Sequence, residues 1–136
     1  MESRIRAGIL TVSDKGSRGE REDRSGPAIR EMLEAAGAEI VRTAIVPDEK
    51  DEIGAVLIAW SDEGLDLILT TGGTGLSPRD WTPEATKAVL DRETPGISEA
   101  IRAAGLAKTP TAMLSRAASG IRKSTLIVNL PGSERS

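Results

Sequence analysis

The sequence of 136 residues contains no cysteine and no histidine. Without these side chains the chain has no thiolate nucleophile, no disulfide, no Cys/His zinc site and no imidazole base, which excludes every Ser-His-Asp arrangement. A bound metal ion would have to be a hard cation held by carboxylates, carbonyls, substrate oxygens and water. These ligands favour Mg²⁺ over zinc or copper.

Aromatic side chains are almost as scarce, since the chain has Trp60 and Trp81 but no phenylalanine or tyrosine. The core must therefore be aliphatic, and a chain of this length can bury one without crosslinks. A large excess of positive charge is also lacking, because the net charge is −3. Binding to a nucleic-acid backbone needs clustered lysine and arginine, so we expect no nucleic-acid partner.

Long hydrophobic runs are missing as well. The first apolar run, Ile5–Val12, is much shorter than a membrane span or the core of a signal peptide. We therefore expect a cytoplasmic protein with no membrane partner.

Short apolar runs alternate with helical patterns along the chain. Strands are predicted over Ile5–Val12, Ala38–Val46, Leu65–Thr71 and Leu126–Asn129, and helices after Ser25, Asp48 and Thr82 and over Ile97–Lys108. In the first helix Ile29, Met32, Leu33 and Ala36 recur at helical spacing, whereas SDKGSRG, residues 13–19, has the composition of a loop. The alternation predicts a single α/β domain whose sheet is mostly parallel and has helices on both faces.

In such sheets ligands bind outside the carboxyl ends of the strands. The loop TTGGTG, Thr70–Gly75, lies at one of these ends, but it lacks the lysine of a Walker A loop, and Pro78 stands where G-x-G-x-x-G needs its last glycine. Gly72, Gly73 and Gly75 permit positive φ and could direct N–H groups at an anion. A tight turn between strand and helix explains the same glycines, so both interpretations stay open.

Two aspartates at these strand ends are candidate metal ligands. Asp80 precedes the helix start at Thr82 and could bind Mg²⁺, although an acid there also complements the helix dipole. Asp48 is explained fully as a helix cap, yet it could face Asp80 across the same site.

Weaker candidates are Ser13 and Asp14 after the first strand, Ser115 and Arg116 before a turn, and Asn129 and Gly132 at the last strand. Turn chemistry and surface solvation explain these residues equally well. Trp60 fits a buried helical stripe, while Trp81 could border the pocket.

The motifs resemble those of the molybdenum cofactor biosynthesis family, which includes the bacterial molybdopterin adenylyltransferases and the G domains of plant and animal fusion proteins. The matching segments are TVSD (Thr11–Asp14), VPDE (Val46–Glu49), LTTGGTG (Leu69–Gly75), RDWTPEAT (Arg79–Thr86), PG (Pro95–Gly96), LSR (Leu114–Arg116) and NLPG (Asn129–Gly132). They occur in order and span nearly the whole chain. TTGGTG followed by D-x-TPEAT is more specific than any glycine pattern alone.

The resemblance implies a three-layer α/β/α domain, assembled as a homotrimer, that uses ATP and Mg²⁺ to attach AMP to the terminal phosphate of molybdopterin. It implies catalytic and metal-binding roles for Asp80 and Asp48. The implied substrate and nucleotide residues are Ser13, Asp14, Thr71, Gly72, Gly73, Thr74, Gly75, Ser115, Asn129 and Gly132. Family members usually continue into a helix after NLPG, so the expectation is one molybdopterin-binding domain over residues 1–136 from which a closing helix could be absent.

The implied AMP transfer is compatible with a chain that has no histidine and no cysteine. The attacking group in such a transfer is an ionised phosphate, so alignment and charge neutralisation are needed and a histidine or cysteine base is not. Two alternatives stay open: a non-catalytic module of the same fold that binds pterin, and a scaffold domain of the same fold. Other molybdenum cofactor enzymes are possible partners.

Overall fold

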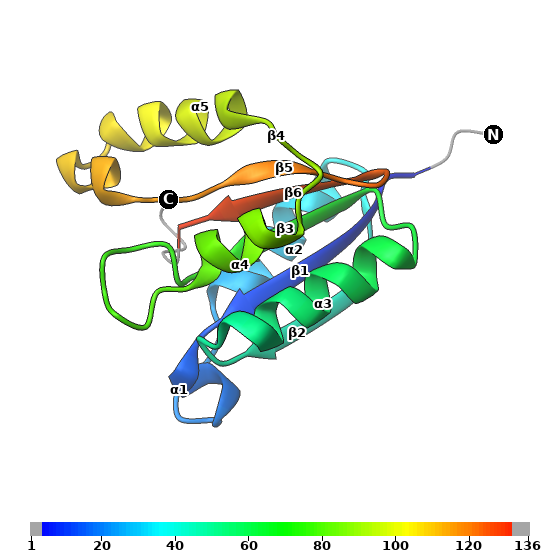
Figure 1. Cartoon of the computed structure of the whole chain (residues 1–136), viewed down its shortest axis with the longest axis horizontal. Coiled ribbons are helices and arrows are strands. Elements are labelled where there is room, and N and C mark those ends of the chain that lie inside the picture. The colour runs from blue at the N-terminus through cyan, green and yellow to red at the C-terminus, as the bar shows by residue number, and fades with distance from the viewer. Residues whose placement is uncertain (1–3, 132–136) are drawn as a thin grey trace.

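A computed structural model describes residues 4–131. Its elements are β1 (Arg6–Val12), α1 (Asp14–Ser17), α2 (Ser25–Ala35), β2 (Glu39–Val46), α3 (Lys50–Asp62), β3 (Leu67–Thr71), α4 (Thr82–Val89), β4 (Arg92–Glu93), α5 (Pro95–Leu106), the 3₁₀ helix η1 (Pro110–Leu114), β5 (Ser119–Arg122) and β6 (Thr125–Leu130). Every predicted strand and helix is present, with ends shifted by a few residues (Figure 1).

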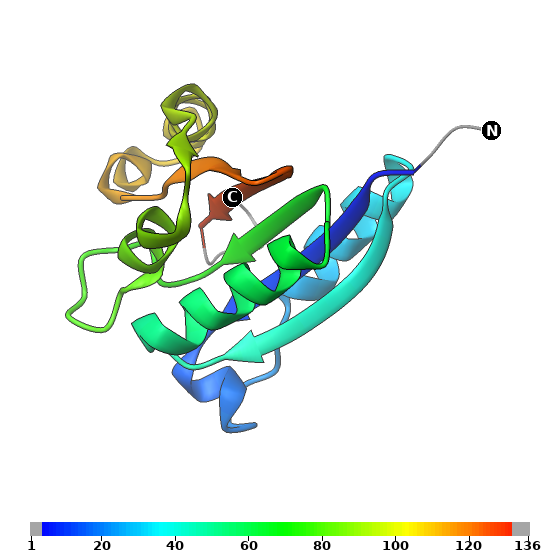
Figure 2. The ribbon, with the colours of Figure 1, turned by 45° about the vertical axis from the view of Figure 1, so that its right-hand side comes forward.

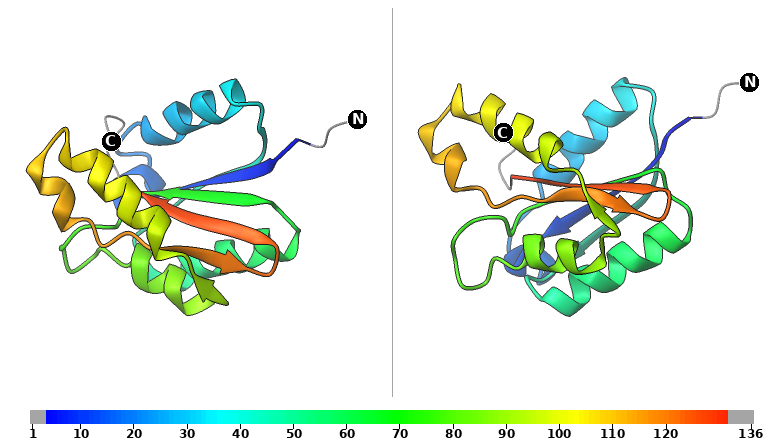
Figure 3. Two further views of the ribbon diagram at one scale, coloured as in Figure 1. Left: turned by 90° about the horizontal axis from the view of Figure 1, so that it is seen from above. Right: turned by 45° about the horizontal axis from the view of Figure 1, so that its top comes forward.

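The six strands form one sheet in the order β2-β1-β3-β6-β5-β4. β1, β2, β3 and β6 are parallel, whereas β5 pairs antiparallel with β6 and β4 pairs antiparallel with β5, so that only β5 runs against the other strands. Helices α2 and α5 cover one face, and α3 and α4 cover the other (Figure 3). The predicted α/β fold with three layers and a mostly parallel central sheet is therefore confirmed.

The order of the strands determines where a crevice opens at the carboxyl ends of the parallel strands. β1 leads through α2 to β2 on one side, while β3 and β6 lie on its other side, so the connections change direction between β1 and β3. The arrowheads of β2 and β3 point the same way, toward the end where α1 and the glycine loop lie (Figure 2). A crevice at such a reversal is where ligands bind in open α/β sheets.

The core is aliphatic apart from one tryptophan. Trp60 on α3 is 7% exposed and packs among buried residues that include Leu10, Leu57 and Ile68. A side chain at Gly8 would lie 2.7 Å from Cε3 of this indole ring, so glycine makes room for it in β1. The buried position predicted for Trp60 is confirmed. Of the apolar residues predicted at helical spacing near α2, Ile29 and Leu33 are half-buried, whereas Met32 is 73% exposed and Ala36 is also exposed.

Two local predictions are wrong. The sequence predicts a loop after β1, but Asp14–Ser17 forms α1, because Ser13 Oγ accepts a hydrogen bond from the Gly16 N–H at 3.0 Å. The sequence also predicts Asp48 as the cap of α3, but the N-cap is Glu49. At α4 the N-cap is Trp81, and Thr82 is the first helical residue. The side chains of Asp48 and Thr82 are thus not used for capping.

Candidate functional site

The glycine loop presses against the end of β1 and the start of α4. Gly72 and Gly73 have φ values of 95° and 70°, which favour glycine. A methyl group on Gly72 would collide with the Val12 carbonyl oxygen, and one on Gly73 would collide with Thr82 Oγ1 and lie 2.9 Å from Asp48 Oδ1. The tight turn is therefore real, and it brings the loop against two other segments of the site.

The same loop leaves backbone donors free. Within residues 4–131 the N–H groups of Gly73, Thr74 and Gly75 donate no hydrogen bond. The loop carbonyls, in contrast, are used: Gly73 O accepts from the Thr82 N–H at 3.1 Å, and Thr74 O accepts from the Arg116 N–H at 2.9 Å. A loop with fixed carbonyls and successive free N–H groups can bind an anion.

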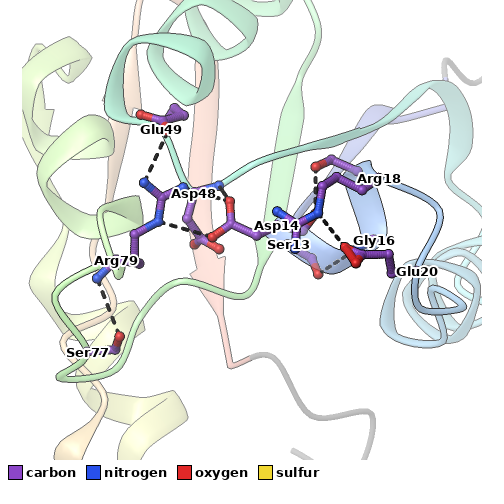
Figure 4. A network of polar contacts seen from close by, with 10 residues as sticks. Ser13, Asp14, Gly16, Arg18, Glu20, Asp48, Glu49, Ser77 and Arg79 are labelled. Carbon is purple, nitrogen blue, oxygen red and sulfur yellow. Dashed lines mark hydrogen bonds and ion pairs between the residues drawn. The ribbon is translucent and has the colours of Figure 1, made fainter.

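Arg79 joins three of the ligand-side loops (Figure 4). Its guanidinium donates to both carboxylate oxygens of Asp14, at 3.1 and 2.8 Å, and pairs with Glu49 at 3.1 Å. Asp14 also accepts the backbone N–H of Asp48 at 3.0 Å. These contacts lower the pKa of Asp14, with the Arg79 hydrogen bond as the largest cause, and raise the pKa of Arg79.

Asp48 has the opposite environment. Its Oδ1 is buried and, among the residues that the structure describes, has no hydrogen-bond partner. Burial raises the pKa of Asp48, and the negative charges of Asp14 and Asp80 raise it further. Asp48 is thus a desolvated carboxyl group near two other acids, and a cation would stabilise its charged form.

Asp80 is fixed by its own loop and by Arg116. Its Oδ2 accepts the Ser77 N–H at 2.8 Å, and its N–H donates to Ser77 O at 2.9 Å. The Arg116 guanidinium donates to Asp80 O and Gly75 O, both at 2.8 Å, and pairs with Glu84. Arg116 therefore holds both ends of the segment that carries Asp80.

The sequence did not single out Arg79 as a candidate residue, and it indicated Arg116 only as a weaker one, without a role. Each stands within a segment that carries the family resemblance, RDWTPEAT and LSR respectively. Spacing along the chain did not reveal their roles, because their partners lie on other loops, as far as 65 residues away for Arg79 and Asp14.

Several predicted binding residues have side chains engaged within the protein. Asn129 is buried; its Oδ1 accepts the Ala118 N–H, and its Nδ2 donates to Thr70 Oγ1 and Thr86 Oγ1, at distances of 2.9 to 3.0 Å. Thr71 Oγ1 donates to the Pro131 carbonyl at 2.9 Å. Ser13 caps α1. These three residues fix the strand ends around the site.

The other residues predicted to line the site lie in different places. Ser115 is partly buried and adjoins Arg116, and its Oγ accepts the Ala117 N–H at 3.3 Å. Trp81 is 40% exposed beside Asp80. Gly132 lies outside the described residues, as does the chain end where a closing helix was considered. The structure thus brings together Asp14, Asp48 and the glycine loop, with Asp80 near enough to act on the charge of Asp48.

Two absences hold for the part of the chain that the structure describes. Residues 4–131 contain no helix of the length and apolarity that crossing a membrane requires. They also contain no group of three or more Asp, Glu, His or Cys side chains arranged to hold a metal ion.

Comparison with known proteins gives consistent results over almost the full chain. Residues 8–136 match the family model described as "Probable molybdopterin binding domain". The molybdopterin adenylyltransferase of Helicobacter pylori strain J99 is 47% identical over 135 residues, which cover 97% of this chain and 77% of that protein. The Drosophila melanogaster molybdenum cofactor synthesis protein cinnamon is also 47% identical, but the chain spans only 23% of its length.

A solved structure agrees with the sequence comparison. The molybdopterin biosynthesis enzyme MoaB from Thermus thermophilus superimposes with a TM-score of 0.91 at 59% identity, covering 96% of this chain and 83% of that one. The chain therefore belongs to the molybdenum cofactor biosynthesis family and is a homologue of molybdopterin adenylyltransferases.

Proposed function

We propose that this protein transfers AMP from ATP to the terminal phosphate of molybdopterin, with release of pyrophosphate and with Mg²⁺ as cofactor. The observation that carries the proposal is the position of Asp48 and Asp80 beside a glycine loop with free N–H groups, in a chain 47% identical to a molybdopterin adenylyltransferase.

The residues present suit this chemistry. An oxygen of the terminal molybdopterin phosphate attacks the α-phosphorus of ATP, and the bond from that phosphorus to the bridging oxygen of pyrophosphate breaks. The attacking oxygen is already ionised, so no side chain has to remove a proton. The free N–H groups of Gly73, Thr74 and Gly75 would bind phosphate oxygens and hold the two reactants in line.

Mg²⁺ fits the acids of the site. Asp48 Oδ1 is a buried carboxylate oxygen that accepts no hydrogen bond from the described residues. Such an oxygen can serve as a ligand of a hard cation. When bound, Mg²⁺ would neutralise charge on the phosphate oxygens. Asp48 and Asp80 would hold it, and Mg²⁺ commonly binds through one or two carboxylates while water and substrate phosphates supply its other ligands.

The test is AMP transfer by wild-type protein and by Asp80→Asn, with molybdopterin, ATP and Mg²⁺, followed as adenylylated pterin by chromatography. We expect product with the wild type and none with the variant, while the variant keeps its circular dichroism spectrum. Asp51→Asn, an exposed residue in the first turn of α3, serves as the matched control and should leave the transfer unchanged.

Other outcomes would reject the proposal in distinct ways. Full turnover by Asp80→Asn would remove the assigned role of that residue. Tight pterin binding by the wild type, without product and without dependence on ATP, would instead indicate a binding module. Partner binding that survives loss of both acids would indicate a scaffold.

We further propose that the protein acts in the cytosol as a homotrimer. Leu76 and Met113, which are 65% and 64% exposed, are apolar side chains that an interface between copies would cover. Light scattering of the purified protein should give three times the mass of 14.3 kDa. A monomer mass would contradict the assembly and leave the proposed reaction standing.

A further inference from the structure

Thr82 carries a buried hydroxyl group that the fold does not use. The residue is 0% exposed, and its Oγ1 has no hydrogen-bond partner among the described residues. It is not the cap of α4, since Trp81 is the N-cap. A buried hydroxyl without a partner costs about 1–3 kcal/mol, which a valine of the same shape would not incur. The hydroxyl therefore calls for a role outside folding.

The hydroxyl faces the same space as the unpaired oxygen of Asp48. Thr82 Oγ1 and Asp48 Oδ1 both border the position that a side chain on Gly73 would occupy. Asp48 Oδ1 and Thr82 Oγ1 are two of the three buried side-chain oxygens that lack a partner in residues 4–131. The third, on Thr94, precedes α5. Two unpaired oxygens from different segments thus meet beside one glycine of the phosphate-binding loop.

An oxygen pair of this kind matches the ligands of a hard cation. Mg²⁺ binds carboxylate and hydroxyl oxygens, and in P-loops the Ser or Thr that follows the glycines binds Mg²⁺ at the start of the helix. Thr82 occupies a comparable place, because it opens α4 after the glycine loop and its N–H donates to Gly73 O. The third acid nearby, Asp14, is engaged elsewhere, because both of its carboxylate oxygens accept hydrogen bonds from Arg79.

We propose that Thr82 Oγ1 is a protein ligand of the Mg²⁺ site, together with Asp48 and Asp80. The inference rests on the proposed function, because it assumes that Mg²⁺ binds at these acids. Thr82 then contributes a neutral oxygen, and Gly73 is required because any side chain there would fill the space between the two oxygens.

The experiment measures Mn²⁺ binding by electron paramagnetic resonance, with α,β-methylene-ATP present, for wild type, Thr82→Val and Thr82→Ser. We expect Thr82→Val to weaken Mn²⁺ binding roughly tenfold or more, the size of effect seen when a metal site loses a partner, and Thr82→Ser to retain it. Without metal, Thr82→Val should melt at the same temperature as wild type or higher, since it removes an unpaired hydroxyl.

Thr86→Val is the matched control. Thr86 is equally buried on α4, but its hydroxyl accepts a hydrogen bond from Asn129 at 3.0 Å. This variant should lose stability, because the amide of Asn129 loses an acceptor, and should keep wild-type affinity for Mn²⁺. The pair of variants therefore separates metal binding from packing.

Three results would overturn the proposal. Wild-type Mn²⁺ affinity in Thr82→Val, with weakened binding in Asp48→Asn, would exclude Thr82 alone and leave the proposed function intact. A lower melting temperature of metal-free Thr82→Val would show that the hydroxyl stabilises the fold. Absence of Mn²⁺ binding by the wild type would reject the metal site, and with it the Mg²⁺ part of the proposed function.

Discussion

Two aspartates of the site differ in how their charge is compensated. Asp14 has Arg79 on both of its oxygens, whereas Asp48 Oδ1 is buried and unpaired among the described residues. Both residues stand in short polar motifs that the sequence singled out, and nothing in those motifs distinguishes a paired from an unpaired acid. The difference arises from the distant loop that supplies Arg79, so it could not be predicted from local spacing.

We predict that Asp48→Asn increases stability at neutral pH by about 0.5–1 kcal/mol while it abolishes AMP transfer. The pKa of Asp48 is raised in the folded protein by burial first and by Asp14 second, so its charged form disfavours folding. Protonation removes this cost, and the stability difference between variant and wild type should therefore shrink as pH falls through the raised pKa. Melting temperatures of both proteins between pH 4 and 8 measure this. A variant that melts below wild type at pH 8 would contradict it.

At the scale of elements, the periodic segments were predicted well and the irregular ones were not. Apolar runs gave β1, β3 and β6, because strands buried on both faces leave a strong signal. The edge strand β2 has no fully buried residue and was indicated by its β-branched residues instead. β4 and β5 have two and four residues and show no alternation. The hairpin between β5 and β6 turns at Lys123, which adopts a φ of 54° without the glycine that would have signalled the turn.

The guanidinium of Arg116 holds the loop that carries Asp80. We predict that Arg116→Lys lowers both the stability of the protein and its rate of AMP transfer. A lysine ammonium cannot reach Gly75 O, Asp80 O and Glu84 together as the guanidinium does. The expected cost is roughly 1–3 kcal/mol of stability, with a larger effect on AMP transfer, about tenfold or more, because Asp80 loses its position.

Thermal unfolding and steady-state transfer rates measure the two effects of Arg116→Lys. Arg30→Lys is the control, since Arg30 pairs with Glu34 on the exposed face of α2 and a lysine can keep that pair. Equal transfer rates for Arg116→Lys and Arg30→Lys would show that the guanidinium contacts of Arg116 do not position Asp80.

For the whole molecule, the loops at one end of the sheet are held together by charge. Arg79 and Arg116 both join the segment after β3 to segments that are distant in the chain. The class of fold and the ligand side of the sheet followed from the alternation of strands and helices. Which residues meet across that side did not, because it depends on the order β2-β1-β3-β6, which periodicity does not specify.

We predict that these ion pairs make stability fall in acid. The pKa values of Asp14 and Glu84 are lowered in the folded protein, by Arg79 and Arg116 respectively. Their contribution is complete above the unfolded pKa, about 4, and is lost as pH falls through the lowered folded pKa. The melting temperature should therefore drop below pH ~4, and the drop should be shallower for Glu84→Gln.

Melting curves from pH 3 to 7 measure this dependence. Glu31→Gln is the control, because Glu31 is an exposed residue of α2, and its curve should follow wild type. If Glu84→Gln shows the same acid profile as wild type, the pair with Arg116 does not contribute.

The scarcity of aromatic residues has a spectroscopic consequence. The chain has no tyrosine, so its fluorescence comes from Trp60 and Trp81 alone. Trp60 is buried in the core, while Trp81 is 40% exposed and adjoins Asp80. One indole therefore reports the integrity of the core, and the other, accessible to iodide quenching, stands beside the acid at the centre of the site. The protein contains its own optical reporter of ligand binding, without an added label.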